Sequence, residues 1–270
     1  MKLRFYLFTF FAHKILKNNW NYLNNGIIFM KGGNVLMERI SIKNENLSNY
    51  IMFKLDKIEN AFTQEELNQI TEVVIDYNDE EDNSFSSLEE LLKLENIKSI
   101  TLRNGYIFND NYNIFLKLNN LTEFVFENCE FENVNLITSL KLKSLSLINC
   151  KIEKYTFISI LENLEELSIV NGTLEIRKLN MLKHLRYLQI SYSDIVDEES
   201  LNISTLVELY VDNTNISTFD FLNNLLNLKR ISIDENQYNN NKELFNNLMK
   251  KNILVLNENM VEFGGENNEI

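Results

Sequence analysis

The chain has 270 residues, of which 44% are hydrophobic and 24% charged, a balance typical of a folded protein rather than a disordered one. Its formal net charge of −13 would repel a phosphate backbone and no basic stretch offsets it, so we expect no nucleic-acid partner. The two cysteines, Cys129 and Cys150, are too few for a disulfide framework and are expected to be buried, reduced thiols.

Residues 1–36 are set apart from the rest of the chain. Lys2 and Arg4 precede an apolar run from Phe5 to Ala12, which is short for a signal-peptide core and is not followed by a small-residue cleavage site. The run is also too short to cross a bilayer as a helix, so no membrane span is expected. We interpret residues 1–36 as a mis-called start or a non-native leader, with a weak signal sequence as the alternative.

Residues 37–69 are expected to form a helical cap at the N-terminal end of the fold. Apolar residues recur at helical spacing from Leu47 to Ile58, and the stretch Thr63-Gln-Glu-Glu66 has the form of a capping box. A terminal cap needs a polar outer face and an apolar inner face that packs on the first repeat. This composition therefore predicts a cap rather than a separate domain.

From Leu121 to Ile233 the sequence repeats every 21 or 22 residues. Each repeat follows the pattern Leu-x-x-Leu-x-Leu with conservative apolar exchanges, and the ninth position is Cys129, Cys150 and Gly172 in the first three regular repeats. The first leucines of the six regular repeats are Leu121, Leu142, Leu164, Leu185, Leu206 and Leu228. Two less regular repeats begin at Ile70 and Ile97, separated by an acidic insertion at residues 79–82.

These repeats resemble leucine-rich repeats, and the segment from Phe62 to Ile70 is similar to the helical N-terminal cap of bacterial internalin-like proteins. The resemblance implies an α/β fold over residues 70–259: a right-handed, curved leucine-rich repeat solenoid with a parallel β-sheet on its concave side. Repeats this short leave room only for 3-10 or single helical turns on the convex side. A short helix from Glu243 to Lys250 and a strand from Ile253 to Leu256 should close the domain, and residues 260–270 are expected to be a flexible tail.

Catalytic chemistry has little support in the sequence. The two histidines, His13 and His184, lie in the leader and just before a strand, and neither belongs to a nucleophile or acid–base motif. No phosphate-binding glycine loop and no Cys/His metal spacing is present. We therefore predict that the chain is not an enzyme and has no cofactor and no metal site.

The outward side chains of the predicted strands form the concave face, which we expect to bind a partner. One outward column runs from Val74 to Val255 and a second from Asp76 to Asn257; both are small and weakly apolar in the middle, then aromatic and acidic toward the C-terminus. Exposed tyrosines with polar neighbours are typical of a binding hot spot. The candidate partner-binding residues are Arg186, Tyr187, Gln189, Tyr192, Glu208, Tyr210 and Asp212.

These observations predict a non-enzymatic, monomeric, cytoplasmic module that binds a protein of neutral or basic surface on its concave face. Two alternatives keep the same fold: an exported, internalin-like protein, secreted or at the cell surface, that binds a host surface protein, and a regulatory subunit that holds an enzyme. A third possibility is self-association through a sheet edge at either end of the solenoid, if the caps are incomplete.

Overall fold

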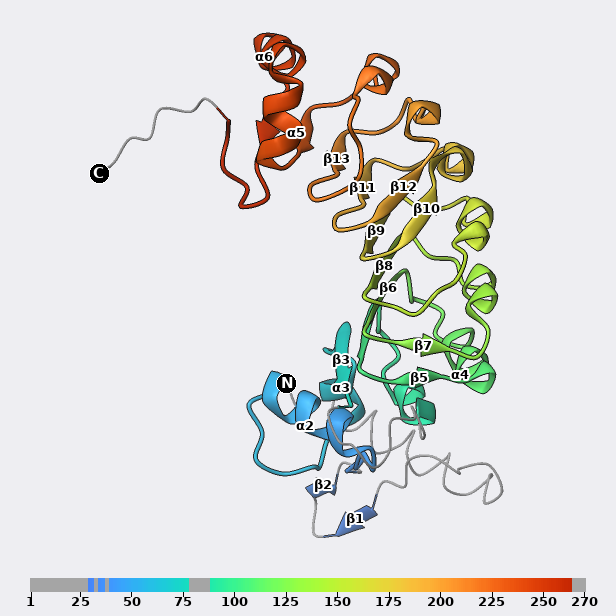
Figure 1. Ribbon diagram of the computed structural model, residues 1–270. Coiled ribbons are helices and arrows are strands. Elements are labelled where there is room, and N and C mark those ends of the chain that lie inside the picture. The colour runs from blue at the N-terminus through green and yellow to red at the C-terminus, as the bar shows by residue number, and fades with distance from the viewer. Residues whose placement is uncertain (1–28, 32–33, 37–38, 78–87, 264–270) are drawn as a thin grey trace, which may run out of the picture.

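The computed structural model describes residues 29–31, 34–36, 39–77 and 88–263. Within these residues the repeats stack into an arc, with a β-sheet on its inner side and short turns on its outer side (Figure 1). The sheet has nine strands, and every pairing between neighbours is parallel. The strands are β3 (Glu72–Asp76), β4 (Ser99–Arg103), β6 (Glu123–Glu127), β8 (Ser144–Ile148), β9 (Glu166–Val170), β11 (Tyr187–Gln189), β13 (Glu208–Tyr210), β14 (Arg230–Ser232) and β15 (Leu254–Leu256).

The register of the sheet explains the repeated leucines. Leu145 pairs with Leu167, which pairs with Leu188, and the same column continues through Leu209 to Ile231; all five side chains are fully buried. Burying one such side chain stabilises the fold by about 1.5 to 3 kcal/mol. A single repeat on its own buries too few of them to offset the entropy cost of ordering its backbone. The stack therefore folds as a unit, and the predicted leucine-rich repeat solenoid is confirmed.

The convex side carries short turns, as the repeat length predicts. Four short strands pair there in parallel, β5 (Tyr106–Ile107) with β7 (Glu130–Phe131) and β10 (Thr173–Glu175) with β12 (Asp194–Val196). One α-helix, α4 (Asn109–Phe115), replaces the 3-10 turn of its repeat. The described 3-10 helices are η1 (Leu88–Lys93), η2 (Val134–Ser139), η3 (Thr156–Ile160), η4 (Ile176–Met181), η5 (Glu198–Ser200) and η6 (Asp220–Asn224).

Asparagines shape the turns that follow five of the described strands. Five of them have left-handed backbone angles, with φ between 52° and 63°: Asn104, Asn128, Asn149, Asn171 and Asn213. Asparagine tolerates this conformation better than most residues. The turn points the Asn128 backbone N–H at the carbonyl of Ile148 in the next repeat, 2.8 Å away, and the Asn128 amide donates to the Asn104 side chain. These five asparagines therefore have a structural role in the turns.

The N-terminal end of the sheet is covered by a cap. Strands β1 (Phe29–Lys31) and β2 (Asn34–Leu36) form an antiparallel hairpin, followed by helices α2 (Glu45–Lys54) and α3 (Gln64–Leu67), and α2 lies against β3 (Figure 1). Helix α2 buries Leu47 and Ile51. The helix predicted to extend to Ile58 ends one turn earlier, at Lys54. The chain turns at Asp56, whose φ is 51°, and Ile58 is exposed.

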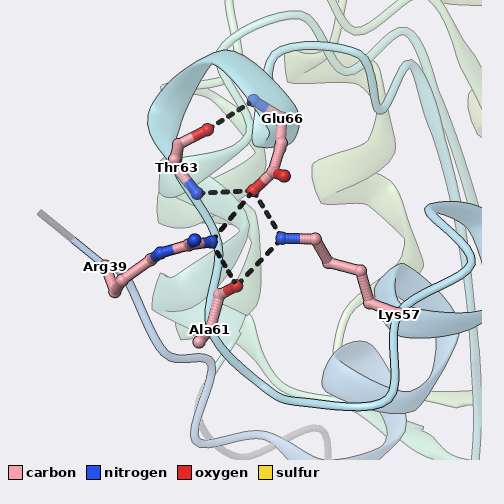
Figure 2. Close-up of polar contacts among 5 residues, drawn as sticks. All are labelled: Arg39, Lys57, Ala61, Thr63 and Glu66. Atoms are coloured by element: carbon pink, nitrogen blue, oxygen red, sulfur yellow. Dashed lines mark hydrogen bonds and ion pairs between the residues drawn. The ribbon is translucent and has the colours of Figure 1, made fainter. Parts of the chain in front are cut away.

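The predicted capping box is present and is linked to the rest of the cap (Figure 2). The Thr63 hydroxyl accepts a hydrogen bond from the Glu66 backbone, while the Glu66 carboxylate accepts one from the Thr63 backbone N–H at 2.8 Å. The same carboxylate pairs with Lys57 at 2.7 Å and lies 3.8 Å from Arg39. The Glu66 side chain therefore joins the start of α3 to Lys57, in the segment after α2, and to Arg39, which precedes α2.

We expect the cap to weaken in acid. The hydrogen bond from Lys57, together with that from the Thr63 backbone, holds the pKa of Glu66 below its ordinary value. A lowered folded-state pKa means that the stabilisation is complete above the unfolded-state pKa and is lost as pH falls through the folded-state pKa. Wild type should therefore melt at a higher temperature than Glu66→Gln at neutral pH, and the difference should shrink as pH falls through the carboxyl range. A difference that does not change with pH would contradict this assignment.

The C-terminal end of the sheet departs from the repeat pattern. Helices α5 (Glu235–Asn240) and α6 (Lys242–Lys250) replace the short turn before β15. Val255 pairs with Ile231 and is fully buried, so the prediction that Val255 faces outward is wrong by one residue. The run from Ile253 to Leu256 is apolar throughout and does not alternate, so the sequence pattern could not show which of its side chains face the core.

The last strand is covered by the chain that follows it. Leu256 forms an antiparallel bridge with Glu262, and the backbone N–H of Phe263 donates to the carbonyl of Val255 at 3.0 Å. The Phe263 ring stacks on Tyr238 with centroids 4.2 Å apart. Residues 260–263, the start of the expected tail, therefore pack on the domain, and residues 264–270 lie outside the described residues. With α2 on β3 and this segment on β15, both ends of the sheet are covered, which disfavours edge-to-edge self-association.

The two cysteines occupy the same position in adjacent repeats. The Cys129 thiol donates to the carbonyl of Leu102 at 3.3 Å, and the Cys150 thiol to that of Phe126 at 3.4 Å. Burial raises the pKa of Cys129 to about 11 and that of Cys150 to about 12. Neither thiol is in a disulfide. Each one supplies a hydrogen-bond donor to the backbone of the preceding repeat inside the core.

We expect both thiols to be unreactive in the folded protein. The nucleophile is the thiolate, which burial and the raised pKa suppress at neutral pH. A disulfide-exchange reagent should modify neither cysteine in native buffer and both after denaturation, with modification rates that follow unfolding. Fast stoichiometric labelling of the native protein would show that this part of the core is open.

Candidate protein-binding surface on the concave face

Three columns of side chains project from the concave face, one from each outward position of the strands. They follow directly from the register, because Glu166, Tyr187, Glu208 and Arg230 are successive partners across β9, β11, β13 and β14. A second column contains Ser168, Gln189, Tyr210 and Ser232, and a third contains Ser191, Asp212 and Asp234. The C-terminal half of this face thus combines two tyrosines, one arginine and several acids.

Four of these residues form what we call the tyrosine cluster: Tyr187, Glu208, Tyr210 and Arg230. The two tyrosine rings lie 5.0 Å apart with a 37° tilt. The Glu208 carboxylate accepts hydrogen bonds from the Tyr210 hydroxyl at 2.8 Å and from the Arg230 guanidinium at 3.0 Å. Each polar group thus holds its neighbour in place, so the cluster is largely ordered before any partner arrives.

A polar network continues from the tyrosine cluster across four repeats. The Ser168 hydroxyl donates to the Gln189 side-chain carbonyl at 2.9 Å, and the Gln189 amide reaches the Ser191 hydroxyl at 3.5 Å. Ser191 donates in turn to Asp212 at 3.0 Å, and Ser232 donates to the same carboxylate at 3.4 Å. These bonds tie neighbouring strands together through their side chains and restrict the rotamers on this face.

The predicted residues differ in exposure from what the sequence alone suggests. Tyr210 is only 6% exposed and Asp212 only 7% exposed, while Tyr187, Gln189 and Glu208 are half-buried. The acids of the fringe have local partners, since Glu208 forms an ion pair with Arg230 and Asp212 accepts hydrogen bonds from two serines. Burial, with smaller contributions from Tyr210 and Glu208, raises the pKa of Tyr187 to about 12, so its phenol stays protonated at neutral pH.

Arg186 does not join the tyrosine cluster. It precedes β11, is exposed, and borders a shallow depression of about 380 Å³ at the N-terminal edge of the strands together with His184 and Lys229. Its positive charge contributes to the lowered pKa of the Glu165 carboxyl, after the larger effect of Lys143. Arg186 therefore belongs to the rim of the face and can contact a partner only at its edge.

Tyr192 lies at the opposite edge. It occupies the turn position that asparagine fills in the other regular turns, with a φ of 54°, and its side chain is 58% exposed. Together with Asn213 and Thr173 it lines a cleft at this edge of the sheet. Of the seven predicted residues, the structure therefore places five on the concave face and one at each edge.

Arg230 is the principal residue that sequence reasoning missed. It follows Lys229 and precedes Ile231, so it occupies the same outward column as Tyr187 and Glu208. The prediction traced only the other two outward columns along the whole sheet; it took Tyr187 and Glu208 from this column but did not continue to Arg230. Reading this column as well would have shown an arginine next to a glutamate, a pair that two adjacent parallel strands bring together.

Neither a metal site nor a membrane-spanning helix is found in the part of the chain that the structure describes. No group of three or more histidine, cysteine, aspartate or glutamate side chains there could hold a metal ion. No described helix is long and apolar enough to cross a membrane.

Comparison with solved structures supports the fold. Internalin F of Listeria monocytogenes strain 4b F2365 is 21% identical with a TM-score of 0.52, and the match covers 70% of this chain and 56% of that one. Internalin C2 of the same strain is 21% identical, with a TM-score of 0.49 and coverage of 70% and 92%. Listeria monocytogenes InlP is 14% identical, with a TM-score of 0.48 and coverage of 71% and 64%.

These likenesses concern the fold alone. The chain has the leucine-rich repeat architecture that its repeats resemble, with an internalin-like arrangement of cap and sheet. It spans little more than half of internalin F. No family model matches the sequence, and no curated protein matches it. The fold is typical of protein-binding modules, and the partner has to be approached from the surface of this chain.

Proposed function

We propose that this chain is a non-enzymatic protein-interaction module whose partner docks on the concave face over β11, β13 and β14. The observation that carries the proposal is the tyrosine cluster, in which two adjacent tilted rings and an arginine–glutamate pair hold each other in place on the sheet. Tyrosine and arginine are the residue types most enriched in interface hot spots. A surface that is already ordered loses little side-chain entropy when it binds.

The charges suggest what kind of protein surface fits. Glu208 is matched by Arg230 within the cluster, which favours a neutral, polar partner surface over a strongly charged one. Glu166 is exposed at the side of the cluster and could receive one basic group from the partner. The proposed partner surface is therefore neutral or weakly basic.

A matched pair of variants tests the proposal. Tyr187→Ala removes a half-buried ring from the cluster, whereas Phe53→Ala removes an exposed ring from α2, which packs on β3 at the other end of the sheet from the cluster. Full-length protein carrying each change would be used to capture and cross-link binding proteins from the native lysate. We expect one protein that binds wild type and Phe53→Ala but not Tyr187→Ala, with cross-links to β11, β13 or β14. Equal capture by all three proteins would exclude the concave face.

We also propose that the protein acts in the cytoplasm. The support is chemical: Cys129 and Cys150 are free thiols in adjacent repeats, and reduced thiols persist in reducing compartments. Fractionation of the native cells with an antibody against the domain tests this directly. Recovery of the protein from the medium or the cell surface would favour the exported alternative.

A further inference from the structure

A polar cleft of about 620 Å³ opens where the strands of the central repeats turn toward the convex side. It lies at the edge of the sheet, beside the concave face rather than on it. Three successive repeats contribute Thr173, the pair Tyr192 and Asp194, and Asn213. Its size is in the range of small-ligand sites, but its lining is more polar than usual for them and includes no lysine or arginine.

Tyr192 is held in a conformation that costs an aromatic residue free energy. Its φ of 54° is left-handed, and the corresponding position is asparagine in five other turns. The ring is 58% exposed, so burial compensates for little of this cost. Backbone outliers of this kind concentrate at functional sites, where the unfavourable geometry serves to position a side chain. At this position the geometry presents an aromatic ring at the mouth of the cleft.

The back of the cleft shows a second unusual arrangement. A Cβ atom at Gly172 would lie 2.8 Å from the Tyr155 hydroxyl oxygen, so glycine leaves the room that this hydroxyl occupies. Tyr155 borders the cleft and is only 6% exposed, and its hydroxyl has no hydrogen-bond partner among the described residues. Buried hydroxyls normally have a partner. This hydroxyl is shielded from solvent as well, so it belongs to the closed wall of the cleft and not to the surface that a ligand can touch.

We propose that this cleft binds a neutral sugar residue of a glycan. A pyranose ring has an apolar C–H face, which can stack on the Tyr192 ring, and hydroxyls around its edge. Asp194 offers a carboxylate acceptor, while Asn213 and Thr173 each offer both donors and acceptors, which matches a polyhydroxylated ligand. The lack of a cationic side chain in the lining argues against a phosphate or sulfate group.

The proposal is independent of the protein-binding function, because Tyr192 and Asp194 lie outside the tyrosine cluster. The test uses the full chain and three neutral disaccharides, lactose, N,N′-diacetylchitobiose and mannobiose, titrated by ligand-observed NMR and calorimetry. We expect at least one of them to bind. Tyr192→Asn should weaken that binding at least about tenfold, while Tyr192→Phe, which keeps the ring, should change it by less than about threefold.

The variants include their own control for folding. Tyr192→Asn introduces the residue type found in the other turns, so this variant should melt at or above the wild-type temperature. Tyr187→Ala, on the concave face, should leave sugar binding unchanged, which separates this proposal from the protein-binding one. Absence of binding of all three disaccharides to wild type, or wild-type affinity of Tyr192→Asn for the bound one, would overturn the proposal.

Discussion

Leu188→Asp is expected to abolish the folded solenoid. Leu188 lies at the centre of the sheet, pairs with Leu167 and Leu209, and is fully buried. Losing a buried leucine side chain costs about 2 to 5 kcal/mol, and burying an unpaired carboxylate adds several kcal/mol more. Because small proteins are stable by only about 5 to 15 kcal/mol, the sum removes most or all of the stability. Circular dichroism during heating should show no cooperative transition like that of wild type.

The control for this variant is Leu188→Met, which roughly conserves volume and apolar character. It should keep a cooperative melt and cost less than about 1.5 kcal/mol. A normal melt of Leu188→Asp would mean that position 188 is not in the core, and the register of every repeat would then have to be revised.

Tyr187→Ala is expected to weaken partner binding by about 30-fold, corresponding to about 2 kcal/mol, the usual threshold for a hot-spot residue. The ring lies against Tyr210, and its removal opens the cluster without disturbing the Glu208–Arg230 pair. Because Tyr187 is half-buried on the sheet surface, the fold should persist. Calorimetric titration of the purified partner into each variant measures the effect.

Two further variants make this result interpretable. Tyr187→Phe keeps the ring and loses only the hydroxyl, whose 3.3 Å hydrogen bond to Gln189 is long, so its affinity should stay close to that of wild type. Phe53→Ala should also bind normally. If Tyr187→Ala binds as tightly as wild type while Phe53→Ala does not, the partner docks on the cap and not on the concave face.

The repeats were predictable because their signal is redundant. Each one repeats the same inward leucines, so the period fixes the strand positions even where Phe124 and Phe126 replace leucine. The last strand departs from this pattern, because α5 and α6 interrupt the 21- or 22-residue period. The apolar run up to Leu256 also shows no alternation of apolar and polar residues. With neither period nor alternation to use, the face on which Val255 lies could be assigned only from its pairing with Ile231.

The candidate site was predictable in composition but not in detail. The sequence places tyrosines and acids in the outward columns. Whether such a side chain is exposed to solvent depends on its neighbours in the next repeat. Asp212 is buried because serines lie on both sides of it, and Tyr192 leaves the face because its backbone turns left-handed. Both effects arise between repeats that are about 21 residues apart, where local patterns carry little information.

Hydroxyl-radical footprinting of the full chain, free and bound to its captured partner, tests the central claim most directly. The oxidation rate of a side chain reports its exposure, and aromatic and methionine side chains on several surfaces can be followed in one experiment. Binding on the concave face predicts that the partner protects Tyr187 while Phe53 on α2 and Met181 at the end of η4 react as in the free protein. Protection of Phe53 or Met181 with Tyr187 unchanged would contradict the account and place the partner on the cap or the convex side.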